Sequence, residues 1–360
     1  MSESAPDLRG QFAPAAPTRR TPPPGGNPAA LIEHAITLVA DDLVLCERRF
    51  AELLHSDIAV IPKVGGHIAF AGGKRFRPLL TLLAAEAAGF EGPERLTVAA
   101  VGELLHTATL LHDDVIDEGE FRRGRPAARM GYGNGMAVLA GDYCLARALQ
   151  AVAHTGREAA VCSLADTVTR MAEGEVAQLD TAGRFSLDRE RYELVIDRKT
   201  AALIAWCSSV ADLVEPAYVE PLRRYGQEIG YAFQIADDVL DVCVTPSMLS
   251  SRCKQPADSG KDPGQDLREG KMTLPIILAC EADAKLRQRV QGVLESGPPM
   301  SDDVVWELLA RLAETDAAEQ ALATAEGHVR AATDALSALP PSPAREALAD
   351  AAHYVVQRSL

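Results

Sequence analysis

Apolar residues recur at helical spacing over long stretches of the chain from about residue 29 onward, and Gly or Pro interrupts these stretches. No convincing alternation of apolar and polar residues, the pattern of a half-buried strand, breaks them. Helices are therefore expected over residues 29–54, 78–89, 94–118, 135–154, 157–182, 188–212, 217–244 and 272–295, with several shorter ones to residue 360. This pattern predicts an all-α fold, a single-domain bundle of ten or more helices over residues 29–360.

Two segments lack this periodicity. Residues 1–28 are rich in Pro and have no apolar core of a secretory signal, so a disordered tail is expected there. Residues 245–265 are rich in Ser, Pro, Gly and charge, which indicates a long mobile loop. The chain has no run of about eighteen uncharged apolar residues, so no transmembrane segment is expected.

Composition narrows the class of protein. Apolar residues make up 47% of the chain, aromatic residues only 5%, and the formal net charge is −15. Such a charge argues against nucleic-acid binding, and an anionic substrate would need local cations or bound metal. The seven cysteines are scattered without a CxxC motif, which favours a reduced, cytoplasmic protein with neither a disulfide framework nor a zinc site.

Two copies of one acidic pattern stand out. DDVID begins at Asp113 and DDVLD begins at Asp237, each directly after an apolar helical stretch. Residues four apart share a helix face, so Asp113 with Asp117, and Asp237 with Asp241, would each present a carboxylate pair. The two carboxylates of such a pair repel each other unless a cation neutralises them. They provide too few oxygen ligands to enclose an ion completely, which suits Mg²⁺ because it also accepts water and phosphate oxygens as ligands. The alternative is two ordinary acidic helix ends.

Basic and polar residues gather close to the acidic motifs in the sequence. GGKRFRP, residues 72–78, places three cations between a Gly pair and a Pro, an arrangement suited to phosphate binding near a helix N-terminus. Lys199 is followed by six uncharged residues, which favours a cleft over bulk water because burying an unpaired ammonium is costly. The candidates are Lys74, Arg75, Arg77, Arg122, Arg123, Lys199, Thr200, Gln234, Lys261 and Lys271. Apart from Lys199, each of these cations taken alone is more simply explained as a solvated surface charge.

Two histidines precede the first motif. His106 lies seven residues before Asp113 and so shares its helix face, either as a donor to phosphate or as a core histidine. His112 with Asp113 forms an HD dipeptide, which admits a metal phosphohydrolase, although His67 and His106 give that hypothesis weak support.

With these motifs the chain resembles the all-trans isoprenyl diphosphate synthases, the polyprenyl synthetase family, and most of all their long-chain members. The motifs stand in the family's order over roughly residues 60–280: GGKRFRP, ELLHTATLLHDDVIDEGEFRRGRP, GDYCLARALQ, EGEVAQLD, DRKTAAL, GYAFQIADDVLD and GKDPGQDLREGKMTLP. The resemblance implies a helical bundle around a deep central cavity, usually as a homodimer. It also implies condensation of isopentenyl diphosphate with an allylic diphosphate to a linear all-trans product, with transient membrane contact for product release.

The resemblance assigns a role to each candidate. About three Mg²⁺ ions are expected on Asp113, Asp117 and Asp237, with Asp114, Asp238 and Asp241 as nearby ligands or support. The expected catalytic residues are Asp113, Asp114, Asp117, Asp237, Asp238 and Lys199. The allylic diphosphate is expected on Arg122, Lys199, Thr200, Gln234, Lys261 and Lys271. Isopentenyl diphosphate is expected on Lys74, Arg77, His106 and Arg123. The gap from Asp241 to Lys261 is longer than the family's usual one, which puts the role of Lys261 in doubt, and Gln178 stands where some relatives carry an aspartate.

Product length is the least determined property. Ala108 lies five residues before Asp113, where short-chain relatives tend to carry a bulky aromatic residue, and Leu104 and Leu105 continue the helix inward. A medium or long product is therefore expected. The alternatives are a short-chain farnesyl or geranylgeranyl diphosphate synthase, a class I terpene cyclase, and a non-catalytic subunit of a heteromeric synthase. The last two fit less well, because the isopentenyl motifs and both acidic motifs are intact.

Overall fold

The computed structural model describes residues 28–69, 75–122, 125–244, 263–297 and 299–357. Residues 1–27 of the predicted N-terminal tail and almost all of the predicted loop over 245–265 lie outside these ranges, whereas Pro28 already begins a helix. Lys74, Arg123 and Lys261 lie outside them as well.

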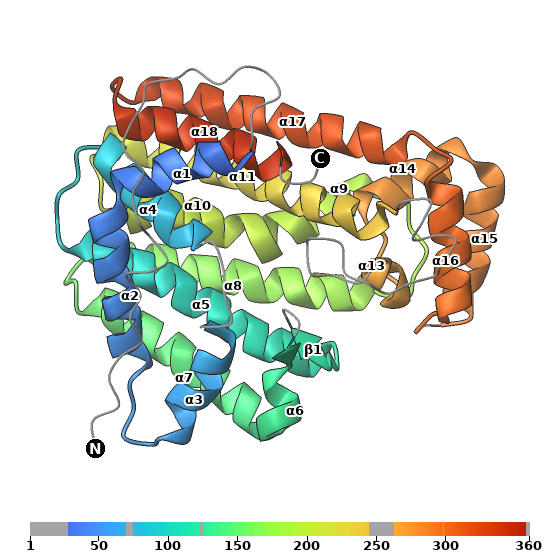
Figure 1. Cartoon of the computed structure of the whole chain (residues 1–360), viewed down its shortest axis with the longest axis horizontal. Helices are drawn as coiled ribbons and strands as arrows, with labels where there is room; N and C mark the ends of the chain where they lie inside the picture. Colours follow the sequence, from blue (N-terminus) through green and yellow to red (C-terminus); the bar gives the residue numbers. More distant parts are fainter. Residues whose placement is uncertain (1–27, 70–74, 123–124, 245–262, 298, 358–360) are drawn as a thin grey trace.

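The described residues are almost entirely helical, which confirms the expected all-α bundle (Figure 1). The α-helices of the first half are α1 (Pro28–Leu38), α2 (Ala40–Leu54), α3 (Val60–Ala69), α4 (Phe76–Ala87), α5 (Glu94–Ile116), α6 (Ala128–Tyr132), α7 (Asn134–Ala153) and α8 (Glu158–Thr181). Those of the second half are α9 (Arg189–Ile196), α10 (Ala202–Ser208), α11 (Pro216–Val242), α13 (Gln265–Arg268), α14 (Leu274–Ala282), α15 (Ala284–Glu295), α16 (Asp302–Leu312), α17 (Ala317–Ala335) and α18 (Pro343–Gln357). Short elements complete the set: the π-helix η2 (Asp197–Ala201), the 3-10 helices η3 (Val210–Asp212) and η4 (Leu336–Ala338), and the two-stranded hairpin β1 (Phe121–Arg122) with β2 (Arg125–Pro126).

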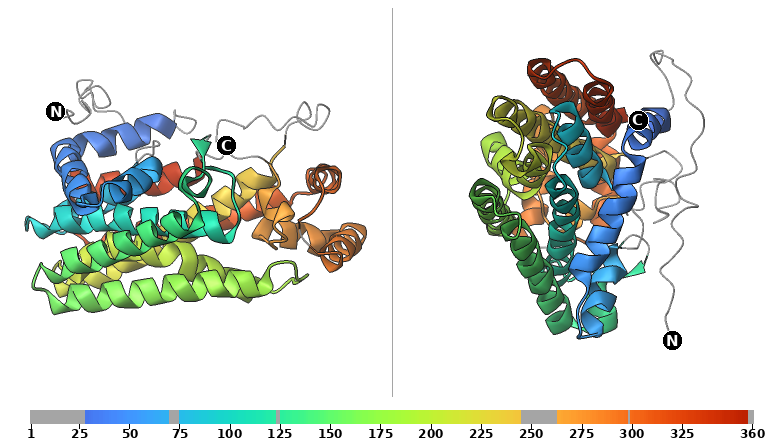
Figure 2. Two further views of the ribbon diagram at one scale, coloured as in Figure 1. Left: turned by 90° about the horizontal axis from the view of Figure 1, so that it is seen from below. Right: turned by 90° about the vertical axis from the view of Figure 1, so that its left-hand side faces the viewer.

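The long helices run side by side along the molecule, and α5 lies inside the bundle (Figures 1 and 2). Helices α2, α4 and α7 pack around α5, while α11 packs against α10 and α17. Residues 98–105 of α5 are all buried, which explains why this helix is apolar over most of its circumference until the acidic motif begins. At the other end of the molecule α13, α14, α15 and α16 form a cluster beyond the ends of α8 and α11 (Figure 1).

Most predicted helices are present, but three are interrupted. The predicted helix over 29–54 divides at Val39 into α1 and α2, and that over 272–295 divides at Asp283. The Asp283 side chain accepts hydrogen bonds from the backbone N–H groups of Lys285 and Leu286, so it starts a new helix. The third, over 188–212, contains the π-helix and a 3-10 turn. Helices α3 and α6 and the hairpin were not predicted, because each is too short to carry a clear period.

Helix α7 is the one described helix that has the length and apolar character of a membrane span. Soluble core helices pass the same test, and 39% of its most apolar window is buried inside the bundle. Its sequence also carries Asp142 and Arg147.

Small residues let the π-helix approach its neighbours closely. A Cβ atom on Gly174 of α8 would lie 2.5 Å from the backbone nitrogen of Lys199. A Cβ atom on Gly230 of α11 would collide with the Cα atom of Ala201, at the other end of the π-helix. The two glycines therefore set the distance at which α8 and α11 hold this segment.

We expect Gly230→Ala to lower the free energy of unfolding by about 1–3 kcal/mol, because the added methyl group meets backbone that cannot rotate away. Chemical denaturation measures this change. Gly292→Ala in α15 is the matched control, since that glycine is exposed with no atom near its added Cβ. Helix propensity alone would stabilise both variants by about 1 kcal/mol, so stabilisation of Gly230→Ala would contradict the packing argument.

Candidate active site

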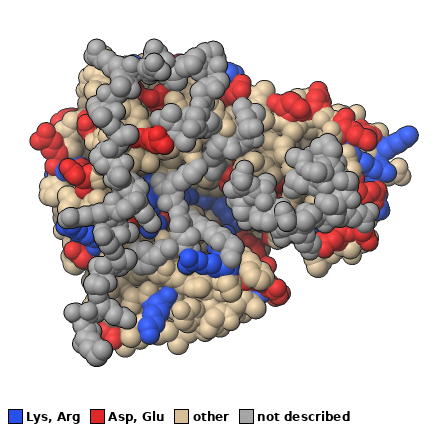
Figure 3. All heavy atoms as spheres, in the orientation of Figure 1, with Lys and Arg blue, Asp and Glu red and all other residues tan. Residues whose placement is uncertain are grey.

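A cavity of about 1440 Å³ runs through the bundle between α5, α8 and α11. Its mouth is polar and is lined by residues of both acidic motifs, the π-helix and the segment around α13. Figure 3 shows Lys and Arg side chains in the hollow at the centre of one face, although the net charge of the whole chain is −15. Cations and carboxylates therefore line the same cavity, and the cations provide the local positive charge that an anionic substrate requires.

The first acidic motif ends α5 at the cavity mouth. Asp113 and Asp117 both line the cavity, one helical turn apart, and the backbone N–H of Asp117 donates to the carbonyl of Asp113 at 2.8 Å. Burial raises the pKa of Asp113 to about 6, and the carboxylates of Glu175 and Asp117 add to this effect while Lys199 opposes it. Burial also raises the pKa of Asp117. These carboxylates are close together and partly desolvated, which makes their ionised forms unfavourable. A bound cation would offset this electrostatic free-energy cost.

Asp114 serves a different purpose from its neighbours. Its side chain is fully buried, and one carboxylate oxygen accepts a hydrogen bond from the Arg122 Nε at 2.8 Å. Because successive residues of a helix are about 100° apart, Asp114 faces the hairpin while Asp113 faces the cavity. Asp114 therefore holds Arg122 of β1 at the cavity wall.

The second acidic motif, on α11, divides in the same way. Asp237 and Asp238 both line the cavity, but Asp238 is almost fully buried and accepts hydrogen bonds from the Tyr192 hydroxyl at 2.6 Å and the Gln234 amide at 2.8 Å. Thr200 of the π-helix donates to Gln234 at 2.8 Å. These four side chains form one chain of hydrogen bonds, which places Thr200 and Gln234 together at the cavity wall, as expected.

Asp241 caps the short helix α13. Its two carboxylate oxygens accept the backbone N–H groups of Gln265 at 3.0 Å and Asp266 at 3.1 Å, and its carbonyl accepts that of Gly264. An aspartate in this position satisfies the first N–H groups of a helix. Asp241 thus anchors residues 264–266 to the end of α11. Of its two expected roles, metal ligand or support, this geometry favours support.

Lys199 points into the cavity, as its sequence context predicted. It extends from the π-helix, lies 2.5 Å from the Glu175 carboxylate of α8, and leaves 24% of its side chain exposed. The other oxygen of Glu175 is buried without a hydrogen-bond partner. The π-helix carries both Lys199 and Thr200, which is consistent with the frequent occurrence of π-bulges at functional sites.

A second half-buried lysine, Lys271, also lines the cavity. Lys271 forms an ion pair with Glu269. Burial lowers the pKa of Lys271, but the carboxylates of Glu269, Asp266 and Asp117 outweigh that effect and leave the pKa raised. Lys271 is therefore charged at neutral pH and lies within the electrostatic reach of Asp117.

The isopentenyl candidates occupy another part of the same cavity. Arg77 and His106 both line it, and the Arg77 Nε is buried without a hydrogen-bond partner. Burial lowers the pKa of Arg77, while the nearby carboxylate of Glu103 opposes that shift. A buried guanidinium with a donor left over is suited to an incoming phosphate.

The deeper part of the cavity is apolar. Leu105 and Ala108 of α5 line it, together with Leu145 of α7 and Val168 and Met171 of α8. The expectation that Leu104 shares this wall is wrong, because Leu104 is fully buried in the hydrophobic core and does not line the cavity. Adjacent helical residues point about 100° apart, so Leu104 and Leu105 face different sides.

The HD hypothesis finds no support in the geometry. His112 packs on Gly141 of α7, and its Nε2 lies 3.2 Å from both the Val138 carbonyl and the Asp142 carboxylate. In the parts of the chain that the structure describes, no three His, Cys, Asp or Glu side chains lie close enough to hold an ion alone. An ion on the cavity aspartates would complete its shell with water and substrate oxygens, which is how Mg²⁺ is commonly bound.

Several residues of the site were not predicted. Glu175, Tyr192, Glu269 and Glu103 each pair with a predicted residue, or stand near one, from a distant part of the sequence. The segment EGEVAQLD carries Glu175 and was recognised as a motif, but its pairing with Lys199 depends on how α8 and the π-helix pack.

Comparison with known proteins agrees with this geometry. The sequence model of the family described as polyprenyl synthetase matches residues 59–311. Octaprenyl diphosphate synthase of Escherichia coli is 36% identical over 331 residues, which cover 91% of this chain and 99% of that protein. A short chain isoprenyl diphosphate synthase of Methanothermobacter thermautotrophicus is 37% identical over 324 residues, which cover 87% and 95% of the two chains.

A solved structure has the same architecture. The polyprenyl synthase of Caulobacter crescentus, in complex with calcium and isoprenyl diphosphate, superimposes with a TM-score of 0.82 at 34% identity, covering 94% of this chain and all of that one. The family resemblance seen in the motifs is thereby confirmed, and the chain belongs to the polyprenyl synthetase family of all-trans isoprenyl diphosphate synthases.

Proposed function

We propose that this protein is a Mg²⁺-dependent prenyltransferase that condenses isopentenyl diphosphate with an allylic diphosphate, head to tail. Its product is a linear all-trans polyprenyl diphosphate of medium or long chain. The observation that carries the proposal is one cavity with carboxylates and cations at its mouth and apolar side chains in its depth. Such a cavity fits a substrate with a diphosphate at one end and a growing hydrocarbon at the other.

The aspartates that line the cavity are the residues to hold metal. Asp113, Asp117 and Asp237 would provide oxygen ligands, with Asp114, Asp238 and Asp241 holding the surrounding elements in place. Mg²⁺, about three ions in relatives of this type, stabilises negative charge on the departing diphosphate when bound. The calcium in the Caulobacter structure supports a divalent cation at such a site.

The cations divide between two substrates. Lys199, Lys271 and Arg122 surround the aspartates and bind the allylic diphosphate, and Thr200 and Gln234 contact it from the cavity wall. Arg77 and His106 bind isopentenyl diphosphate. Lys74, Arg123 and Lys261, outside the described residues, keep the assignments that the resemblance implies.

These groups perform the reaction by position and charge. Cleavage of the allylic C–O bond leaves its electron pair on the diphosphate, where the cations stabilise it. The isopentenyl double bond then attacks the allylic cation, which forms the new C–C bond and leaves a tertiary carbocation. Loss of one proton from that cation to the released diphosphate forms the new double bond. The apolar walls around Leu105 and Ala108 exclude water that would otherwise quench the cation.

Other members of the same enzyme class fit less well. A terpene cyclase needs no site for isopentenyl diphosphate, yet Arg77 and His106 line the cavity here. A non-catalytic subunit would tolerate the loss of an acidic motif, yet both motifs place an aspartate in the cavity. These observations favour a complete synthase, in the cytoplasm as the scattered cysteines indicate.

We also propose that the protein acts as a homodimer through exposed apolar side chains of α7 and α8, those of α8 lying at the edge of the cavity. Met136 and Leu139 of α7 and Val176 and Leu179 of α8 are large apolar side chains with exposed fractions of 44–65%. Apolar side chains so concentrated on neighbouring helices are typical of an interface. A second copy of the chain on this face also accounts for the hydropathy of α7 without a membrane.

Asp113→Asn or Asp237→Asn is expected to lower kcat by about a thousandfold or more, because each change removes a ligand of the metal that stabilises the leaving group. Steady-state condensation of labelled isopentenyl diphosphate measures this. Asp166→Asn, at an exposed position of α8, is the matched control. Near-normal turnover in either cavity variant, or activity that survives chelation of divalent ions, would refute the metal assignment.

Ala108→Phe is expected to shorten the main product to about fifteen to twenty carbons, because an aromatic ring would block the apolar shaft beside Leu105. Chromatography of the dephosphorylated products gives the chain length. Ala108→Ser, which adds no comparable bulk, should keep the long product. An unchanged distribution from a folded and active Ala108→Phe variant would rule out this path for the growing chain.

Leu139→Glu together with Val176→Glu is expected to convert a dimer to a monomer, because four charges would be placed in one interface. Light scattering after gel filtration measures the mass. Ala323→Glu, at an exposed position of α17 on the opposite edge of the bundle (Figure 1), should remain dimeric. A wild-type monomer, or a doubly substituted dimer, would disprove the proposed interface.

A further inference from the structure

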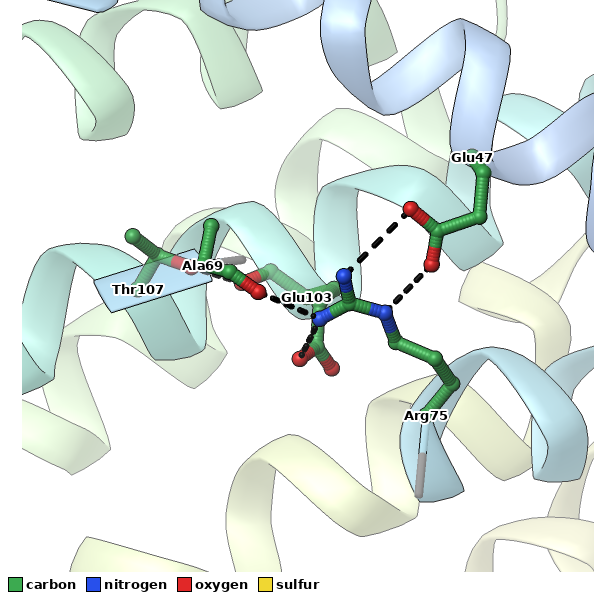
Figure 4. Close-up of polar contacts among 5 residues, drawn as sticks. All are labelled: Glu47, Ala69, Arg75, Glu103 and Thr107. Carbon is green, nitrogen blue, oxygen red and sulfur yellow. Dashed lines mark hydrogen bonds and ion pairs between the residues drawn. The ribbon is translucent and has the colours of Figure 1, made fainter. Parts of the chain in front are cut away.

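Three charged side chains form a cluster near the isopentenyl part of the cavity (Figure 4). Arg75, which directly precedes α4, lies between Glu47 of α2 and Glu103 of α5. Its Nε and Nη2 donate to the Glu47 carboxylate, and its Nη1 donates to Glu103 at 3.2 Å and to the Ala69 carbonyl at 2.9 Å. Arg75 therefore ties together α2, α5 and the end of α3.

The guanidinium of Arg75 is committed to the protein. All three of its nitrogen atoms donate hydrogen bonds, and only 15% of its side chain is exposed. Although the motif GGKRFRP contains three cations, the guanidinium of Arg75 already donates to protein acceptors and has few N–H groups left to donate to a phosphate. Its role lies in what it does to its neighbours.

Two carboxylates share this one guanidinium. The side chains of Glu47 and Glu103 are 18% and 9% exposed, so neither carboxylate has much water around it. A buried carboxylate without a partner is costly, and it will pair with any cation within reach. Arg77 is a second cation near Glu103: both line the cavity, and Glu103 is the side chain that most favours the charged form of Arg77.

The backbone brings these groups together. Arg75 adopts φ +48° and ψ +42°, in the left-handed region that non-glycine residues seldom occupy. Its hydrogen bonds to three elements fix this conformation and so the direction in which α4 begins. Arg77 follows within the first turn of α4 and lines the cavity with its Nε lacking a hydrogen-bond partner.

We propose that Arg75 is a positioning residue that keeps Glu103 engaged and thereby leaves Arg77 available to the diphosphate of the isopentenyl substrate. The inference rests on the proposed function, which places that diphosphate on Arg77. Without Arg75, Glu103 turns to Arg77 and competes with the substrate for it. Binding of isopentenyl diphosphate then weakens, while the allylic site at the aspartates is unaffected.

The test is a set of variants in which the competing carboxylate is removed or kept. Arg75→Gln is expected to raise the Kd for isopentenyl diphosphate, measured by titration calorimetry, roughly tenfold or more, because a charge-assisted hydrogen bond is lost. The KM for the allylic primer should change far less. Arg75→Gln/Glu103→Gln should bring the Kd back toward the wild-type value, because Arg77 then has no competitor.

Two further variants control for general disruption. Glu47→Gln removes the other carboxylate of the cluster, so it should lower thermal stability without weakening isopentenyl diphosphate binding. Arg75→Lys serves if Arg75→Gln does not fold, because one ammonium cannot bridge both carboxylates as the guanidinium does. It should raise the Kd in the same direction, and Glu103→Gln should again reverse the effect.

Failure of the inference and failure of the proposed function give different results. If Arg77→Ala binds isopentenyl diphosphate as tightly as the wild type, the proposed substrate site is wrong. If Arg77→Ala weakens binding but the double variant binds no better than Arg75→Gln, the positioning role of Arg75 is wrong. Equal weakening by Glu47→Gln and Arg75→Gln would overturn it as well, because the cluster would then act only through stability.

Discussion

The structure depends on keeping unlike charges close together in a partly buried cavity without letting them cancel. Burial raises the pKa of Asp113 to about 6, and Lys199, Glu175 and Asp117 stand close enough to act on it as well. In bulk water the same groups would be solvated and weakly coupled. Held on packed helices they form a preorganised site, whose energetic cost is offset when metal and diphosphate bind.

The fold provides the rigid support that this arrangement needs. Each acidic motif gives some carboxylates to the cavity and others to the scaffold: Asp114 holds Arg122, Asp238 accepts from Tyr192 and Gln234, and Asp241 caps α13. The same division applies to the cations, since Arg75 binds the scaffold while Arg77 faces the cavity. A repeated sequence motif thus serves two physical tasks, according to the hydrogen-bond partners that the packed elements bring to each carboxylate.

Sequence could predict the helices and the residues that line the site, but few of their pairings. Period and composition sufficed for α5, α7, α8 and α11, and helical spacing brought Asp113 together with Asp117. The bond between Tyr192 and Asp238, the pair of Lys199 and Glu175, and the π-helix all depend on packing between segments far apart in the chain, for which one sequence gives no direct signal. Leu104 and Leu105 show the same limit on a smaller scale, because both are apolar and only the orientation of α5 decides which lines the cavity.

The central claim is that the cavity binds two diphosphates with metal and joins their hydrocarbon chains. The most direct test incubates the purified wild-type protein with Mg²⁺, labelled isopentenyl diphosphate and allylic primers of about five to twenty carbons, then sizes the dephosphorylated products. A ladder of all-trans products that lengthens by five-carbon units and depends on Mg²⁺ would agree with the claim. Consumption of an allylic primer to a cyclic product without incorporation of isopentenyl label, or no reaction with any primer, would contradict it.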